Sequence, residues 1–300
     1  MPAERTAYLA AEGFSAELAA ELGDAEELCP RLFLARGEPR PAAWAQNVWF
    51  DPQEIAIASI ADAARRLRAI QRNWAVYAPL LHRRAMLIQG QLPPVSARPL
   101  VFGENAPTAP LGSWTLIDPQ TVLAAPHCSS PFPHGEARFV EDRLGPPSRA
   151  YLKLWEALTL VGARPQPGET CVDLGAAPGG WSWVLQRLGA RVIAVDKAPL
   201  APDIATLPGV EQRRDSAFAL DPAALGPVDW VFSDLVCYPA RLFALVERWL
   251  AAGTCRRFVC TVKFQGATDH AAAARFAAIP GSRLMHLFHN KHELTWVKLE

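Results

Sequence analysis

The chain has 300 residues, of which 50% are hydrophobic, enough material for two ordinary domains with separate cores. Its 30 basic and 30 acidic residues cancel. This balance excludes a general polycation, so any contact with nucleic acid must come from local positive charge. The N-terminus lacks the basic-then-apolar pattern of a signal peptide, and no apolar run is long enough to span a bilayer. We therefore expect a cytoplasmic protein that does not contact a membrane.

The first part of the chain, residues 1–140, has short and weakly periodic elements. Apolar residues recur at helical spacing across residues 55–70, and residues 100–102 and 114–117 are short strand candidates. Prolines and turn residues are dense from 91 to 147, which indicates an irregular β-rich module that runs into a proline-rich linker. We expect a small α+β accessory region here.

Positive charge is concentrated in this region. Between residues 61 and 100, seven arginines stand against one acid, Asp62. The seven are Arg65, Arg66, Arg68, Arg72, Arg83, Arg84 and Arg98. Such a stripe is either a face that contacts RNA phosphates or an ordinary solvated helix face, and the sequence leaves both interpretations open.

From residue 147 the pattern changes to alternating strands and helices. We expect helices at 148–161 (capped by Ser148), 180–188, 239–251 and 268–278, and strands at 170–174, 191–196, 210–213, 228–233, 256–263, 283–288 and 294–299. The last two strands are separated by a hairpin-sized gap and should pair antiparallel. Residues 141–300 therefore predict a Rossmann-like α/β domain, a doubly wound sheet with a C-terminal antiparallel hairpin strand.

Ligands bind such sheets at the carboxyl ends of the strands, where this sequence places a glycine-rich loop. The run Asp-Leu-Gly-Ala-Ala-Pro-Gly-Gly-Trp (173–181) lacks the Gly-x-Gly-x-x-Gly spacing that binds a pyrophosphate, and it puts a carboxylate beside the ligand instead. This suits a cationic cofactor without phosphate, S-adenosylmethionine. The residues expected to contact it are Asp173, Gly175, Ala177, Pro178, Gly179, Gly180 and Trp181.

Further acids follow the neighbouring strands. Asp196 closes the second strand, where it can accept both ribose hydroxyls, and Asp215 follows the third, where it can accept from an adenine amino group. Asp234 ends the fourth strand and completes the expected cofactor contacts. Any one of these could be an ordinary cap or turn aspartate, but acids at successive strand ends favour a binding site.

A second set of residues indicates catalysis: Lys153, Asp234, Lys263 and Glu293. The chain has only five lysines among its 30 basic residues. Lys263 ends a strand, and a lysine rather than an arginine at this position suggests that a titratable amine is needed there. A lysine amine can lose its proton when it is desolvated beside another cation. Methylation of a hydroxyl needs a base of this kind. The alternative is a pair of ordinary ion pairs at strand ends.

Several motifs resemble the FtsJ-type ribose 2′-O-methyltransferases. They are Ser-Arg-Ala-Tyr-Leu-Lys-Leu (148–154), the glycine loop, Val-Asp-Lys-Ala-Pro-Leu (195–200), Ser-Asp-Leu-Val (233–236), Val-Lys-Phe-Gln-Gly (262–266) and Glu-Leu-Thr-Trp-Val (293–297). The resemblance implies that Lys153, Asp234, Lys263 and Glu293 form a catalytic Lys-Asp-Lys-Glu tetrad. Within the family, the likeness is to enzymes that methylate a cytidine ribose of 23S ribosomal RNA, which implies that RNA as partner.

The N-terminal region departs from that branch of the family. Its members carry an RNA-binding THUMP domain before the catalytic domain, and about 140 residues are short for both. Residues 86–133 would then be a reduced THUMP-like module. Transfer RNA or a messenger cap as substrate, a non-catalytic RNA-binding role and a small-molecule O-methyltransferase remain alternatives.

Histidines and cysteines give weaker signals. His286, His289 and His292 cross a strand end and a turn without a set of further ligands, so we expect no metal. The six cysteines form no Cys-x-x-Cys pair, and Cys171 and Cys260 lie in apolar runs, which predicts buried free thiols. No feature specifies an oligomeric state, and a monomer is expected.

Overall fold

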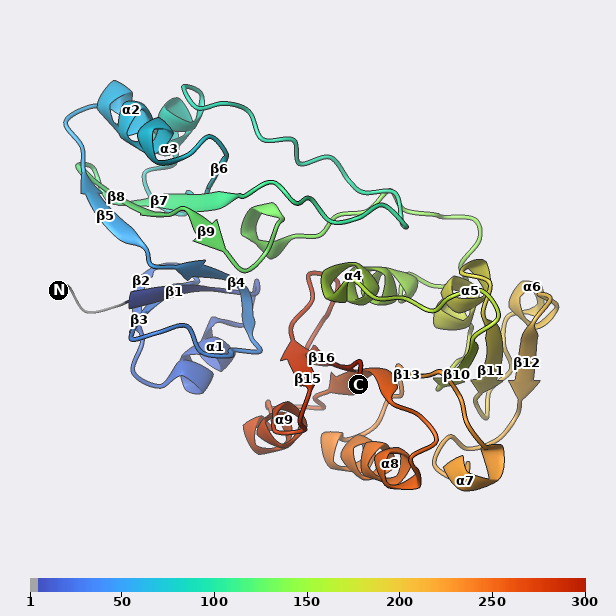
Figure 1. Cartoon of the computed structure of the whole chain (residues 1–300). Helices are drawn as coiled ribbons and strands as arrows, with labels where there is room; N and C mark the ends of the chain where they lie inside the picture. The colour runs from blue at the N-terminus through green and yellow to red at the C-terminus, as the bar shows by residue number, and fades with distance from the viewer. Residues whose placement is uncertain (1–4) are drawn as a thin grey trace. The chain divides into compact units, whose positions relative to one another are not determined.

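The computed structural model describes residues 5–300. These form two compact units (Figure 1). The N-terminal unit holds the chain up to Leu100 and Ala106–Arg138, and the C-terminal unit holds Val101–Asn105 and Phe139–Glu300. The chain therefore passes from one unit to the other three times, because the short segment Val101–Asn105 belongs to the C-terminal unit while both its flanks belong to the N-terminal one.

The N-terminal unit begins with an antiparallel sheet in the order β2-β3-β1-β4-β9. Its strands are β1 (Arg5–Ala10), β2 (Glu26–Cys29), β3 (Leu32–Arg36), β4 (Ala45–Phe50) and β9 (His127–Cys128). Helix α1 (Ser15–Leu22) buries Leu18 and Leu22. The fully buried side chains of Leu9, Leu32 and Trp49 form the centre of this part of the core.

A second sheet of the same unit has the order β5-β8-β7-β6. It consists of β5 (Gln53–Ala56), β6 (Trp74–Val76), β7 (Gly112–Asp118) and β8 (Thr121–Ala125), with helices α2 (Ile60–Ile70) and α3 (His82–Gln89). Leu67, Ile88, Trp74 and Trp114 are buried together in its core. A 3-10 turn, η1 (Pro133–Gly135), lies near the end of the unit. The expected strand at 114–117 is confirmed as part of β7.

Two expectations for this region are wrong. The helix expected at 55–70 begins only at Ile60, because Ser59 caps it by accepting from the backbone N–H of Asp62, and the residues before it form β5 against β8. The strand expected at 100–102 does not form. Isolated bridges stand in its place, one at Leu100 and one that joins Phe102 to Glu104. The Phe102 ring stacks on Trp155 of the same unit, with ring centroids 4.7 Å apart.

The C-terminal unit confirms the doubly wound sheet. Its seven strands follow the order β12-β11-β10-β13-β14-β16-β15, all parallel except β16, which pairs antiparallel with both β14 and β15. The strands are β10 (Thr170–Leu174), β11 (Arg191–Val195), β12 (Val210–Arg213), β13 (Trp230–Ser233), β14 (Arg257–Lys263), β15 (Ser282–Met285) and β16 (Glu293–Lys298). The strand order changes direction between β10 and β13, the point where such sheets bind ligands.

Six helices accompany this sheet (Figure 1). They are α4 (Tyr151–Val161), α5 (Gly180–Arg187), α6 (Pro202–Ala205), α7 (Pro222–Leu225), α8 (Pro239–Ala252) and α9 (His270–Ala277). The expectation that Ser148 caps the first of them is wrong, since α4 starts at Tyr151 without a side-chain cap. The Ser148 hydroxyl lies instead against Gly180, where an added Cβ would come within 2.9 Å of it.

All six cysteines are free, and all but the half-buried Cys128 are buried, as the sequence predicts for Cys171 and Cys260. Within residues 5–300, no helix combines the length and the apolar character needed to cross a bilayer.

Candidate active site

The glycine-rich loop connects the end of β10 to the start of α5. Gly175 and Gly179 have φ of 80° and 116°, which L side chains rarely adopt. A Cβ on Gly175 would lie 2.8 Å from Leu235, and one on Gly179 would lie 2.7 Å from Ile204. Both glycines are therefore required by the backbone and by packing within the protein, whether or not a ligand approaches them.

Asp173 lies at this edge of the sheet and is completely buried. The Ser182 hydroxyl donates to its Oδ2 at 2.7 Å, while its Oδ1 has no hydrogen-bond partner among residues 5–300. Burial raises the pKa of Asp173 to about 7; the Ser182 hydrogen bond opposes the rise, and the negative charges of Asp234 and Asp196 add to it. Three carboxylates thus lie close enough to repel one another, an arrangement that a bound cation would relieve.

The other residues expected to bind the cofactor differ in their burial and in their hydrogen-bond partners. The Asp196 carboxylate accepts from the backbone N–H of Ala177 at 3.1 Å and of Ala198 at 2.9 Å, so it ties the glycine loop to the end of β11. Trp181 is buried, and its indole donates to Ala150 O at 2.9 Å. Asp215 is exposed after β12, and its carboxylate accepts from Ser216 N. The structure therefore gathers Asp173, Asp196 and Asp234, and leaves Asp215 at an exposed turn.

The raised pKa of Asp173 predicts a pH dependence of stability. Because the folded state holds this proton up to about pH 7 and the unfolded state releases it near its ordinary pKa of about 4, the folded protein loses stability as pH rises between these values and levels off above. Asp173→Asn removes the titration. We expect the Tm of the variant, relative to the unaltered protein, to increase from pH 5 to pH 7 without added cofactor. Parallel Tm curves would contradict the buried carboxyl as the source.

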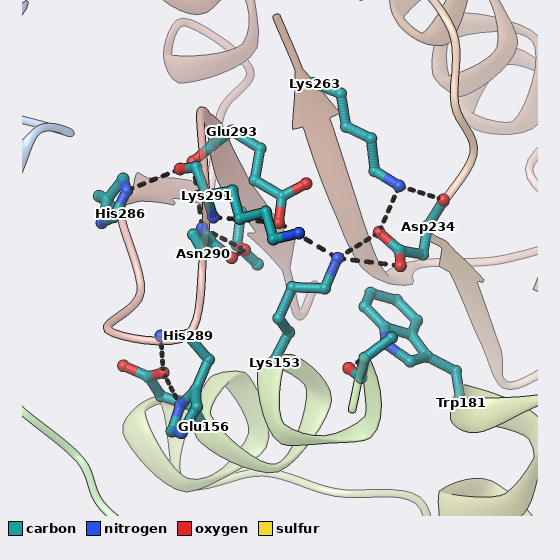
Figure 2. Close-up of polar contacts among 12 residues, drawn as sticks. Lys153, Glu156, Trp181, Asp234, Lys263, His286, His289, Asn290, Lys291 and Glu293 are labelled. Atoms are coloured by element: carbon teal, nitrogen blue, oxygen red, sulfur yellow. Dashed lines mark hydrogen bonds and ion pairs between the residues drawn. The ribbon is translucent and has the colours of Figure 1, made fainter. Parts of the chain in front are cut away.

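The structure brings Lys153, Asp234, Lys263 and Glu293 into one connected cluster (Figure 2). Lys153 Nζ donates to both oxygens of the Asp234 carboxylate, at 2.7 and 2.9 Å, and lies 3.2 Å from Glu293 Oε1. Lys263 Nζ lies 2.9 Å from Asp234 Oδ1 and donates to the Asp234 carbonyl at 2.7 Å. Asp234 thus bridges the two amines.

The cluster is positioned by one helix and three strands. Lys153 projects from the first turn of α4, and Asp234 follows β13 directly. Lys263 and Glu293 are directly opposed on the antiparallel strands β14 and β16, which places their side chains on the same face of the sheet. Two amines and two carboxylates balance in charge, which lowers the cost of keeping these side chains largely out of water.

A buried carboxylate one turn after Lys153 was not expected from the sequence. Glu156 is completely buried, and it accepts from Phe288 N at 2.7 Å, His289 N at 3.0 Å and His289 Nδ1 at 2.7 Å. Burial raises the pKa of Glu156, and the bonds from His289 oppose the rise. These bonds fix the loop that precedes Glu293 onto α4, the helix that carries Lys153 (Figure 2).

The three histidines of this loop face different partners. His289 binds Glu156, His286 Nε2 lies 3.0 Å from Lys291 O, and His292 Nε2 lies 2.7 Å from Thr268 Oγ1. Across residues 5–300, no group of three histidine, cysteine or acidic side chains is arranged to hold a metal ion. Each histidine therefore has a local role in holding the loop.

Known proteins are similar in sequence to this part of the chain. The model of the FtsJ-like methyltransferase family matches residues 146–274. A protein of Halorhodospira halophila named ribosomal RNA large subunit methyltransferase M is 45% identical over 120 residues, which cover 39% of this chain and 35% of that protein. A protein of the same name from Alkalilimnicola ehrlichii is 36% identical over 207 residues, covering 64% and 57%.

The chain spans about half the length of the curated relatives it matches. A solved structure, TrmN from Thermus thermophilus, covers 98% of both chains at 16% identity and a TM-score of 0.39, too distant to support an inference. The family match includes the glycine loop, Lys153, Asp234 and Lys263. Residues 146–274 of this chain are therefore similar to the FtsJ-like methyltransferase family.

Proposed function

We propose that the protein is an S-adenosylmethionine-dependent RNA methyltransferase that modifies a ribose 2′-hydroxyl, with a cytidine of 23S ribosomal RNA as its target. The cluster of two amines and two carboxylates at the carboxyl edge of the sheet is the observation that carries this proposal. The ribose hydroxyl is a weak nucleophile, and its attack requires a positioned base. The cluster supplies such a base next to the acids that suit a cationic cofactor.

The residues of the glycine loop and its surroundings fit S-adenosylmethionine. The three neighbouring carboxylates of Asp173, Asp196 and Asp234 would hold a positively charged ligand, and Asp173 offers a buried oxygen without a hydrogen-bond partner among residues 5–300. When bound, this cofactor supplies a methyl group on a positively charged sulfur. The other expected contacts, including Asp215, remain part of the same proposal.

In the proposed mechanism the Lys263 amine acts as the base that takes the proton from the 2′-hydroxyl, and the bound cofactor would supply the methyl group for that oxygen. Asp234 orients the Lys263 amine through its carboxylate and its backbone carbonyl. Lys153 donates to both oxygens of the Asp234 carboxylate and so balances its charge. Glu293 binds Lys153 and so fixes the geometry from the opposite strand.

The relatives support large-subunit ribosomal RNA as the substrate, since the matched proteins carry that substrate in their names. The cytidine ribose follows from the motif resemblance. To test the activity, the purified protein is incubated with S-adenosylmethionine labelled in its methyl group and with 23S ribosomal RNA, transfer RNA or a capped transcript. We expect label in 2′-O-methylcytidine from 23S ribosomal RNA. Label on a base, or in transfer RNA alone, would contradict the proposal.

We propose that the N-terminal region, residues 1–140, recognises RNA, and its arginine stripe gives a prediction. On α2, Arg65 and Arg66 both bind Asp62, so glutamine substitutions are preferable to charge reversal. Replacing Arg65, Arg66, Arg68 and Arg72 by glutamine should weaken RNA binding. The slope of log Kd against log salt should fall by about 0.7–0.9 for each phosphate that the variant no longer neutralises. Unchanged binding and slope, with unchanged Tm, would assign the stripe to an ordinary solvated helix face.

A further inference from the structure

The loop between β13 and α8, residues 235–238, begins directly after Asp234 and alternates between packed and exposed side chains. Leu235 packs against Gly175 of the glycine-rich loop, and Cys237 is buried. Val236 and Tyr238 point the other way and are 78% and 64% exposed. Two large apolar side chains are therefore held in water by a loop that is itself anchored on both sides.

Tyr238 is also free to accept a stacking partner. Among residues 5–300, its ring has no aromatic neighbour and its hydroxyl makes no hydrogen bond. Its backbone is fixed, because the Tyr238 carbonyl accepts from Arg241 N at 3.0 Å and Leu242 N at 3.2 Å at the start of α8. A rigid backbone that presents an exposed aromatic ring loses little entropy when a planar group stacks on that ring.

An arginine, Arg241, lies three residues after Tyr238 in the first turn of α8. Arg241 is exposed, lies over the Phe218 ring at 3.8 Å and is within salt-bridge distance of no carboxylate among residues 5–300. Arg241 and Lys263 both lie near the buried Cys237. Burial raises the pKa of that thiol, and the two positive charges oppose the rise. The loop that carries Tyr238 and the first turn of α8 that carries Arg241 thus both lie next to Cys237, which also lies near the amine proposed to act as the base.

We propose that Val236, Tyr238 and Arg241 form a subsite for the target nucleotide, in which Tyr238 stacks on the base and Arg241 binds an adjacent phosphate. This inference rests on the proposed function. A ribose whose 2′-hydroxyl reaches Lys263 carries its base and phosphate at the same end of the sheet, where this loop lies. An exposed aromatic ring and, one helical turn away, an exposed arginine without a carboxylate partner in the described part of the chain are the side-chain types that bind single-stranded nucleic acid.

The experiment measures steady-state methylation of a 23S ribosomal RNA fragment by Tyr238→Ala, Tyr238→Phe and Arg241→Gln. We expect Tyr238→Ala to raise the KM for RNA about 5- to 100-fold, the range for loss of one base–aromatic stack, while Tyr238→Phe stays close to the unaltered protein. Arg241→Gln should lower the salt slope of RNA binding by about 0.7–0.9, the value for one phosphate. The affinity for S-adenosylmethionine should remain unchanged in all three variants.

Leu144→Ala is the matched control, because this apolar side chain is 99% exposed on the same unit but does not follow a residue of the cluster. If the unaltered protein methylates the RNA and Tyr238→Ala has the same KM as Leu144→Ala, the subsite is wrong and the proposed function stands. If Tyr238→Phe loses as much as Tyr238→Ala, stacking is wrong. If the unaltered protein transfers no methyl group to RNA, the proposed function fails and the subsite fails with it.

Discussion

Replacing Lys263 by alanine is expected to lower kcat for RNA methylation by about a thousandfold, within the range of about 10²–10⁴ for loss of a general base. The variant should fold, because Asp234 keeps both hydrogen bonds from Lys153. The affinity for S-adenosylmethionine should stay nearly the same, because the substitution removes a positive charge and leaves the carboxylates of Asp173, Asp196 and Asp234 in place. Single-turnover methylation and calorimetric cofactor binding measure the two effects separately.

Lys298→Ala provides the control for this substitution. Lys298 lies at the end of β16, next to β14, and donates to Pro280 O at 3.0 Å, outside the cluster. It should retain full activity. A Lys263→Ala protein as active as Lys298→Ala would remove the lysine base from the mechanism, and a large loss of cofactor affinity would assign Lys263 to binding instead.

Replacing Asp234 by alanine should reduce activity, stability and cofactor affinity together, unlike the change at Lys263. Asp234 bridges two amines whose side chains are only 10% and 17% exposed. Removing one partner of a largely buried ion pair costs about 3 kcal/mol, and the loss of one of three neighbouring acids weakens the site for a cation. We expect kcat to fall by about a hundredfold because the Lys263 amine loses its orientation. Denaturant unfolding, calorimetry and kinetics measure the three effects.

Glu247→Ala is the corresponding control, since this acid is exposed on α8 and its removal leaves the cluster intact. Its unfolding free energy should change by no more than about 0.5 kcal/mol. An Asp234→Ala protein as stable and active as Glu247→Ala would show that the bridge has no energetic role.

Strand periodicity made much of the site predictable. Parallel strands of one sheet end at a common edge, so the sequence alone places Asp173 and Asp234 together. Lys263 ends β14 and Glu293 begins β16, and one helix and one hairpin separate these strands in the chain. The two residues are directly opposed because β14 and β16 pair antiparallel. Lys153 lies on a helix, so strand periodicity alone does not place it in the cluster.

Other features depend on contacts that leave no local pattern. Glu156 binds the backbone N–H groups of Phe288 and His289, which lie 132 and 133 positions further along the chain. Backbone donors of this kind leave no pattern in the sequence of side chains. The strand expected at 283–288 ends at Met285, and the loop held by Glu156 follows it. The helix expected at 268–278 starts at His270, because Asp269 accepts from Ala272 N and caps it. Phe102 leaves the expected strand because its ring stacks on Trp155.

Mapping 2′-O-methylation across 23S ribosomal RNA tests the central claim most directly. RNA is compared from cells that contain the protein, cells that lack it and cells that contain Lys263→Ala in its place. We predict that a single cytidine ribose loses its methyl group in the second and third samples and regains it when the unaltered protein is restored. Identical maps in all three samples would contradict the proposed activity on this RNA.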